Sequence, residues 1–152
     1  MTRDVDLVVM TAPQVGDELV STLVGDPDLD VPEGEARAAW RDGGTFNVLH
    51  PSTGGKVDVF VHGADDAFTA SRLERRVRAG VLGVGCWVAT AEDVVLAKLR
   101  CRLATRSEVQ WRDCVEIAAN QPLDRAYLDR WAGRLGVADD LADLLDGVDR
   151  GS

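Results

Sequence analysis

The sequence predicts a mixed α/β, or α+β, fold in which a small sheet is followed by a helical lobe. Short segments of alternating apolar and polar residues fill much of the first half, as in 45–50 and 56–62, and such alternation is typical of strands with one buried face. From about Thr90 onward, apolar residues recur three and four positions apart, as in amphipathic helices. We therefore expect a sheet lobe over residues 1–89 and a helical lobe over residues 90–149.

The chain opens with a strand and a helix. We expect the strand, at 4–10, to be buried, and the helix after it to start with Thr11 as its N-cap and Pro13 in its first turn. The Asp-, Pro- and Gly-rich segment 25–44 is then expected to be a loop with a short helix at about 36–40.

A β-hairpin is predicted next, with strands at 45–50 and 56–62 joined by a turn that contains a proline and paired glycines. The segment 71–80 is expected to be a short basic helix that its final glycine closes. A last short strand is expected at 85–90.

The rest of the chain is predicted to be helical. Thr90 with Asp93, and Ser107 with Gln110, have the spacing of capping boxes, and Gly136 separates the last two helices. The apolar positions expected to face the core of the first two of these helices are Val95, Leu96, Leu99, Leu103, Trp111, Cys114, Val115 and Ala118.

Charge is unevenly distributed along the chain. The net charge of −9 argues against general adhesion to nucleic acid, because a polyanion is repelled by a surface of its own sign. Residues 72–112, however, hold nine basic and four acidic side chains, so a polyanionic ligand has a place to bind. Solvated helix faces explain the same arginines equally well.

We expect a soluble, cytoplasmic protein, because the sequence has neither the roughly 20 consecutive apolar residues of a membrane span nor a leader pattern at its start. Cys86, Cys101 and Cys114 lack paired spacing and are expected to be reduced core residues. His50 and His62 are expected to be turn or strand residues rather than parts of a catalytic triad.

Three aspartates suggest a metal site. Asp4 and Asp6 alternate with apolar residues and therefore project to one face of the first strand, about 7 Å apart. Asp58 lies between Val57 and Val59 in the same way, so pairing of the two strands would complete a cluster of three carboxylates. Hard oxygen ligands of this number suit Mg²⁺ or Mn²⁺. The alternative, with all three aspartates facing solvent on a half-exposed sheet, has equal support.

Four segments, "TRDVDLVV", "FNVLHPSTGGKVDVFV", "WVATAEDVVLAKL" and "QWRDCVEIA", occur in an order that resembles the nucleotidyltransferase-fold family of AbiEii-type toxins. The resemblance implies that Asp4 and Asp6 bind metal and that Asp58 binds metal or activates the attacking hydroxyl. It also implies that Lys98 and Asp113 contact the substrate. The activity it implies is transfer of a nucleotidyl group from a nucleoside triphosphate to a hydroxyl of RNA, such as tRNA, or of protein, in a toxin–antitoxin system.

The residues themselves allow two readings of the Lys98 and Asp113 pair. Lys98 carries a flexible charge that could neutralise triphosphate oxygens, and Asp113 lies off the apolar face of its helix, where it could meet Lys98 across the helix pair. A surface position or a simple ion pair is at least as well supported for each.

The family's D-x-D strand follows a Gly-Ser turn that holds the nucleotide phosphates, and this chain starts without one. Either the native protein begins further upstream, or the gene is truncated and the product has lost this phosphate-binding turn. In the second case the chain would be a catalytically inactive binding or regulatory module, with an open sheet edge that favours a homodimer.

Overall fold

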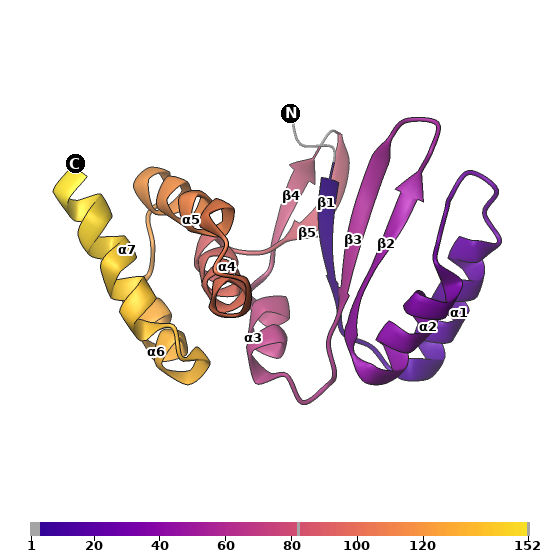
Figure 1. Ribbon diagram of the computed structural model, residues 1–152, viewed down its shortest axis with the longest axis horizontal. Helices are drawn as coiled ribbons and strands as arrows, with labels where there is room; N and C mark the ends of the chain where they lie inside the picture. The colour runs from indigo at the N-terminus through magenta and orange to yellow at the C-terminus, as the bar shows by residue number, and fades with distance from the viewer. Residues whose placement is uncertain (1–3, 82, 152) are drawn as a thin grey trace. The chain divides into compact units, whose positions relative to one another are not determined.

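The computed structural model describes residues 4–81 and 83–151. These residues form the predicted α+β fold, with two small sheets rather than one and with seven helices (Figure 1). The chain divides into two compact units, Met1–Ala70 and Ser71–Ser152. The boundary expected from the sequence, between residues 89 and 90, would instead place the second sheet, whose strands lie within residues 77–88, in the first unit.

A three-stranded mixed sheet forms the centre of the first unit. It consists of β1 (Asp4–Val9), β2 (Gly44–His50) and β3 (Gly55–Val61), in the order β1-β3-β2. β1 runs parallel to β3, whereas β2 pairs with β3 in the predicted antiparallel hairpin. β1 is therefore an edge strand, and Val5 and Leu7 are 58% and 47% exposed. The prediction that this strand is buried was wrong, because nothing in the described residues pairs with its other edge.

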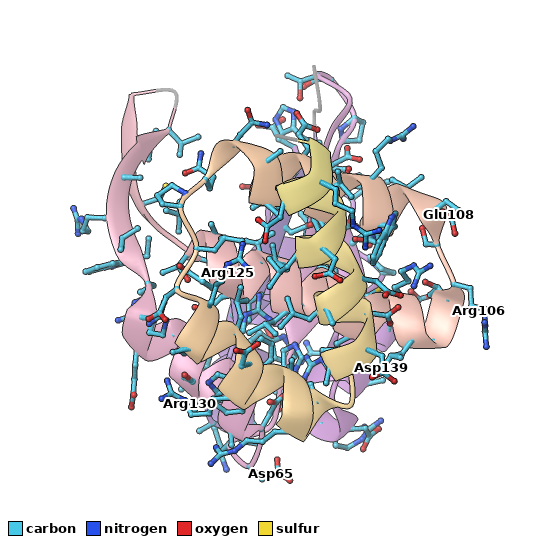
Figure 2. The ribbon with its side chains drawn as sticks, turned by 90° about the vertical axis from the view of Figure 1, so that its left-hand side faces the viewer. Asp65, Arg106, Glu108, Arg125, Arg130 and Asp139 are labelled. Atoms are coloured by element: carbon cyan, nitrogen blue, oxygen red, sulfur yellow. The ribbon has the colours of Figure 1, made fainter. Side chains whose placement is uncertain are left out.

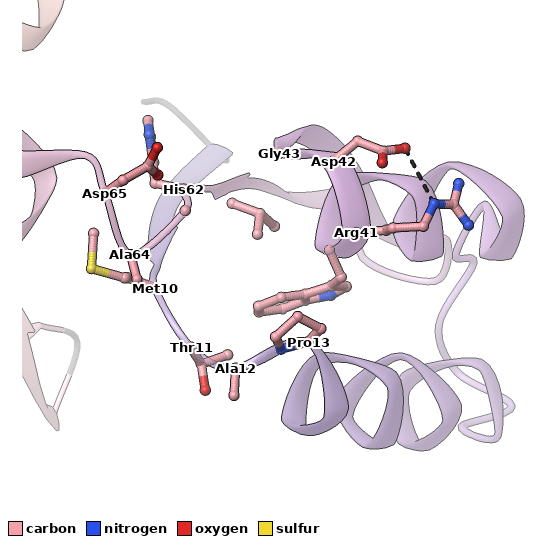
Figure 3. Close-up of a pocket in the computed structure, with 13 residues that line it drawn as sticks. Met10, Thr11, Ala12, Pro13, Arg41, Asp42, Gly43, His62, Ala64 and Asp65 are labelled. Carbon is pink, nitrogen blue, oxygen red and sulfur yellow. Dashed lines mark hydrogen bonds and ion pairs between the residues drawn. The ribbon is translucent and has the colours of Figure 1, made fainter.

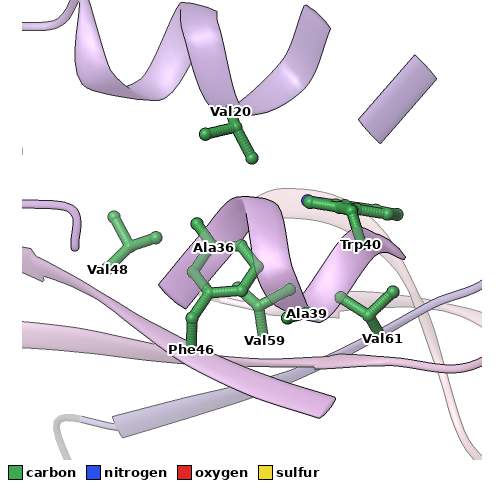
Figure 4. Close-up of a cluster of buried hydrophobic side chains, with 8 residues drawn as sticks. All are labelled: Val20, Ala36, Ala39, Trp40, Phe46, Val48, Val59 and Val61. Atoms are coloured by element: carbon green, nitrogen blue, oxygen red, sulfur yellow. The ribbon is translucent and has the colours of Figure 1, made fainter. Parts of the chain in front are cut away.

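Two helices, α1 (Pro13–Val24) and α2 (Glu33–Asp42), cover one face of this sheet. Figure 4 shows the core between them, built from Val20, Ala36, Ala39, Trp40, Phe46, Val48, Val59 and Val61. The helices approach closely at Gly16, where a Cβ atom would lie 2.4 Å from the Trp40 indole. α2 is longer than predicted because Ala36, Ala39 and Trp40 supply a helical apolar face, which the surrounding Asp, Pro and Gly residues obscure. The N-cap of α1 is Ala12 rather than Thr11.

A helix and a two-stranded ribbon follow. α3 (Ala67–Arg75) is capped by Asp66, whose carboxylate accepts hydrogen bonds from the Thr69 N–H and hydroxyl. β4 (Val77–Val81) and β5 (Val84–Val88) then pair antiparallel. The prediction of one helix over 71–80 was therefore wrong after Arg75, because the following residues find cross-strand partners in β5.

Four helices complete the second unit: α4 (Ala91–Thr105), α5 (Glu108–Asn120), α6 (Arg125–Leu135) and α7 (Ala138–Gly151). Thr90 and Ser107 cap α4 and α5 as predicted, each accepting a hydrogen bond from the backbone N–H three residues later. Arg106 ends α4 in a left-handed conformation, and Figure 2 shows it at the turn with Glu108. None of the described helices is long and apolar enough to cross a membrane.

The core of these four helices contains Val95, Leu96, Leu99 and Cys114, as predicted. Leu103 and Val115 were also expected there, but they are 49% and 37% exposed. Cys101, another expected core residue, is exposed as well.

Candidate functional site

The three aspartates share the sheet face that α1 and α2 leave uncovered. Asp6 is the register partner of Asp58, and Asp4 is the register partner of Lys56. Strand alternation puts these four side chains opposite the buried Val59 and Val61. The two strands pair, so the three aspartates lie on one face as the sequence indicated they would in that case. We call Asp4, Asp6, Asp58 and Lys56 the acidic cluster.

Lys56 supplies the positive charge of the acidic cluster. Its Nζ lies 2.9 Å from Asp58 Oδ2 and 3.7 Å from Asp4 Oδ2. The hydrogen bond to Asp58, followed by the charge of Asp4, raises the pKa of Lys56 above its usual 10.5. The side chain of Asp58 is 19% exposed and that of Asp4 48%, so the more enclosed carboxylate has the closer cationic partner.

The donor set of the acidic cluster fits a hard divalent cation, because all three acids offer carboxylate oxygens. Within residues 4–81 and 83–151, no group of three His, Cys, Asp or Glu side chains is gathered tightly enough to hold a metal ion. The ammonium of Lys56 bridges Asp4 and Asp58. A cation at this face would therefore require Lys56 to swing aside, and the flexible four-carbon chain of lysine allows that.

Lys98 and Asp113 meet across α4 and α5, as the sequence indicated they could. Lys98 Nζ lies 2.8 Å from Asp113 Oδ2 and donates to Gln110 Oε1 at 3.2 Å. Both charged side chains are partly exposed. The pair belongs to the second unit and the acidic cluster to the first.

A hollow of about 640 Å³ lies where the parallel strands β1 and β3 end (Figure 3). Thr11, Ala12 and Pro13 line one side, and Met10 lies with His62 and Asp65 at another (Figure 3). The carboxyl ends of parallel strands are a common position for ligand sites in α/β folds.

The ring of His62 is oriented by an acid, since its Nδ1 lies 2.9 Å from Asp66 Oδ2. Sequence reasoning treated His62 only as a turn or strand residue. The i,i+4 spacing of His62 and Asp66 directly after a strand was the one signal that could have found the pair.

A second acidic group, in the second unit, is fully buried. Asp93 accepts hydrogen bonds from the Tyr127 hydroxyl at 2.6 Å and from the Thr90 hydroxyl at 2.9 Å. Arg75 lies 3.5 Å from Asp93 and stacks 3.7 Å from the centre of the Tyr127 ring. Burial, and then the hydrogen bond to Asp93, raises the pKa of Tyr127. Both carboxylate oxygens of Asp93 accept hydrogen bonds from side chains of the same unit, which is typical of a structural acid.

Neighbouring Glu92 extends this network. Burial alone would raise the pKa of its carboxyl, but hydrogen bonds, chiefly from the Asp124 N–H, and the charge of Arg75 hold it below its usual value. The sequence had pointed to Asp93 only as a capping residue. Its burial depends on α6, which comes more than thirty residues later.

Comparison with protein-family models finds no match to this chain, and comparison with curated proteins finds none either.

Proposed function

We propose that the protein transfers a nucleotidyl group from a nucleoside triphosphate to a hydroxyl acceptor, RNA or protein. The observation that carries this proposal is the parallel register of β1 and β3, which places Asp6 beside Asp58 with Asp4 on the same face. Three carboxylates so arranged are suited to a divalent cation that also holds a triphosphate.

Asp4, Asp6 and Asp58 would hold Mg²⁺ or Mn²⁺. When bound, the cation offsets the charge of the triphosphate and of the departing pyrophosphate. Asp58 accepts the proton of the acceptor hydroxyl as the acceptor oxygen bonds to the α-phosphorus and the bond to pyrophosphate breaks. Lys56, released from Asp58, remains close enough to neutralise a phosphate oxygen.

Lys98 and Asp113 are the proposed substrate-binding pair. Asp113 and Gln110 hold the Lys98 ammonium in a partly exposed position, and such a charge is suited to bind an anionic substrate. The Lys98→Met variant should then raise KM for the nucleotide more than it lowers kcat.

The transfer reaction is tested with α-³²P-labelled nucleoside triphosphates, Mg²⁺ or Mn²⁺, and tRNA or total protein as acceptors. Asp6→Asn and Asp58→Asn should each abolish labelling in single turnovers with little change in folding. Asp17→Asn, which alters an exposed carboxylate on α1, should retain it. Equal labelling by wild type and both cluster variants would remove these aspartates from the mechanism.

The partners and compartment follow from the same proposal. Nucleoside triphosphates and tRNA occur in the cytoplasm, where we place the reaction, and an antitoxin is the expected regulator of a toxin of this type. The exposed edge of β1, with Val5 and Leu7, supports a homodimer formed by strand pairing.

A catalytically inactive binding or regulatory module is the second candidate. The observation that favours it is Lys56, whose ammonium bridges Asp4 and Asp58 where a cation would bind. The hollow beside His62 would then be the ligand site.

Thermal unfolding with Mg²⁺ and each nucleoside triphosphate separates the two candidates. A ligand at 100 times its dissociation constant stabilises the folded state by about 2.7 kcal/mol. The transferase should show this gain with Mg²⁺ and nucleotide together, and Asp6→Asn should lose it. The inactive module should show no Mg²⁺-dependent gain with any nucleotide.

A further inference from the structure

The β4–β5 ribbon in the second unit has two chemically different faces. Strand alternation and the observed register place Val77, Ala79, Val81, Val84, Cys86 and Val88 on one face. The other face carries Arg78 opposite Trp87 and Gly80 opposite Gly85. The first face is apolar, whereas the second combines a cation, an aromatic ring and bare backbone.

Trp87 is the centre of the second face. It is 54% exposed, whereas Trp40 and Trp131 are buried and Trp111 is half-buried. The guanidinium groups of Arg76 and Arg78 lie 4.8 Å and 5.3 Å from the centre of its ring. A large aromatic ring left in water between two arginines is a costly arrangement for a surface without a ligand.

The arginines on this face are not neutralised locally. Residues 75–90 contain no Asp or Glu, and in the part of the chain that the structure describes neither Arg76 nor Arg78 forms an ion pair. Arg76 instead donates to the Leu73 carbonyl, which fixes its guanidinium beside the ring. Arg78 reaches across to β5, where a Cβ at Gly85 would lie 3.4 Å from its Nη2. Both charges thus lie next to Trp87.

We propose that this face, Arg76, Arg78, Trp87 and the Gly80–Gly85 pair, binds single-stranded nucleic acid. A base stacks on Trp87, the two guanidinium groups contact the flanking phosphates, and the glycine pair leaves room for the next nucleotide. Aromatic stacking combined with a cationic track is the usual chemistry of such sites. A protein partner is less favoured, because the described residues of this face present two cations and bare backbone around one aromatic ring. The proposal does not depend on nucleotidyl transfer.

The test is fluorescence anisotropy of labelled U12, dT12 and a 12-base-pair duplex with the full chain, without Mg²⁺ or nucleotide. Single strands should bind in preference to the duplex and should quench tryptophan fluorescence. Trp87→Leu should weaken binding by about tenfold to a hundredfold. Arg76→Gln combined with Arg78→Gln should reduce the slope of log K against log salt by about 1.4, since each phosphate contact on a single strand contributes about 0.7.

Two variants serve as matched controls. Val84→Thr alters the opposite face of the same ribbon at a residue that is 67% exposed. Arg150→Gln removes an exposed charge on α7, where Arg150 pairs with Asp146. Both should bind like wild type. The proposal is overturned if single strands do not bind at low salt, if the duplex binds better, or if Trp87→Leu binds as wild type does.

Discussion

The two units treat their carboxylates in opposite ways. In the first, Asp4 and Asp58 lie on a partly exposed sheet face and share one lysine. In the second, Asp93 is completely buried and receives hydrogen bonds from the Tyr127 and Thr90 hydroxyls. A buried carboxylate requires partners within the fold, whereas an accessible cluster held by one flexible side chain can exchange that partner for a ligand.

The burial and partners of each carboxylate distinguish a structural acid from a functional one, and the position of the acid in the sequence does not. This contrast implies that changes around Asp93 alter stability, while changes in the acidic cluster alter binding and leave stability nearly unchanged.

The largest expected effect is that of Asp93→Ala. Removing this carboxylate leaves Arg75 with Glu92 as its remaining acidic partner and deprives the buried hydroxyls of Tyr127 and Thr90 of their acceptor. We expect a loss of about 3–5 kcal/mol, measured by hydrogen exchange of peptides from residues 91–151. Asp6→Asn should change the same exchange by less than about 0.5 kcal/mol. Similar losses for both variants would break the contrast.

The second largest expected effect is a loss of stability in the first unit. Gly16→Ala would push a methyl group to within 2.4 Å of the Trp40 indole, so we expect about 1–3 kcal/mol of destabilisation. Gly34→Ala, in α2, meets no atom within 4 Å and should be neutral or slightly stabilising. Exchange of peptides from residues 4–61 measures both. A tolerated Gly16→Ala would contradict the close helix contact.

Tyr127→Phe should cost about 1–2 kcal/mol, because it removes the hydrogen bond to Asp93. The raised pKa of Tyr127 means that the folded protein holds this proton more tightly than the unfolded chain does. The associated stability is therefore complete below pH 10 and is lost as pH rises through the raised pKa. Unfolding in urea at increasing alkaline pH should show a smaller decline for Tyr127→Phe than for wild type.

The smallest expected effect concerns only the reactivity of two cysteine thiols. Burial raises the pKa of Cys114 to about 11, whereas Cys101 is exposed. At pH 8, iodoacetamide should label Cys101 and leave Cys114 unmodified until the protein is unfolded. Peptide mass spectrometry reads both sites, and equal labelling rates in the folded protein would show that α4 and α5 open readily.

Local patterns predicted much of the fold. Alternation located β1 and the hairpin, and it placed Asp4, Asp6 and Asp58 on one face, because strand periodicity is independent of tertiary context. Helix caps at Thr90 and Ser107 were equally readable. The meeting of Lys98 with Asp113 also followed from helical spacing.

Features that depend on partners far away in the sequence could not be predicted from local patterns. β4 looks like the end of a basic helix until it is paired with β5. The role of Lys56 depends on the parallel register that puts it beside Asp4. The burial of Asp93 depends on Tyr127. The exposure of β1 depends on its place at the edge of the sheet, where no described strand pairs with its outer side.

The most direct test of the acidic cluster is a Mn²⁺ titration of the full chain followed by electron paramagnetic resonance. The wild-type chain should bind Mn²⁺ saturably, Asp6→Asn and Asp58→Asn should each abolish this binding, and Asp17→Asn should preserve it. Lys56→Met should tighten binding, because it removes the ammonium that competes with the cation. Binding that is absent from wild type and from Lys56→Met, or that survives both cluster substitutions, would contradict the assignment of this sheet face as a metal and nucleotide site.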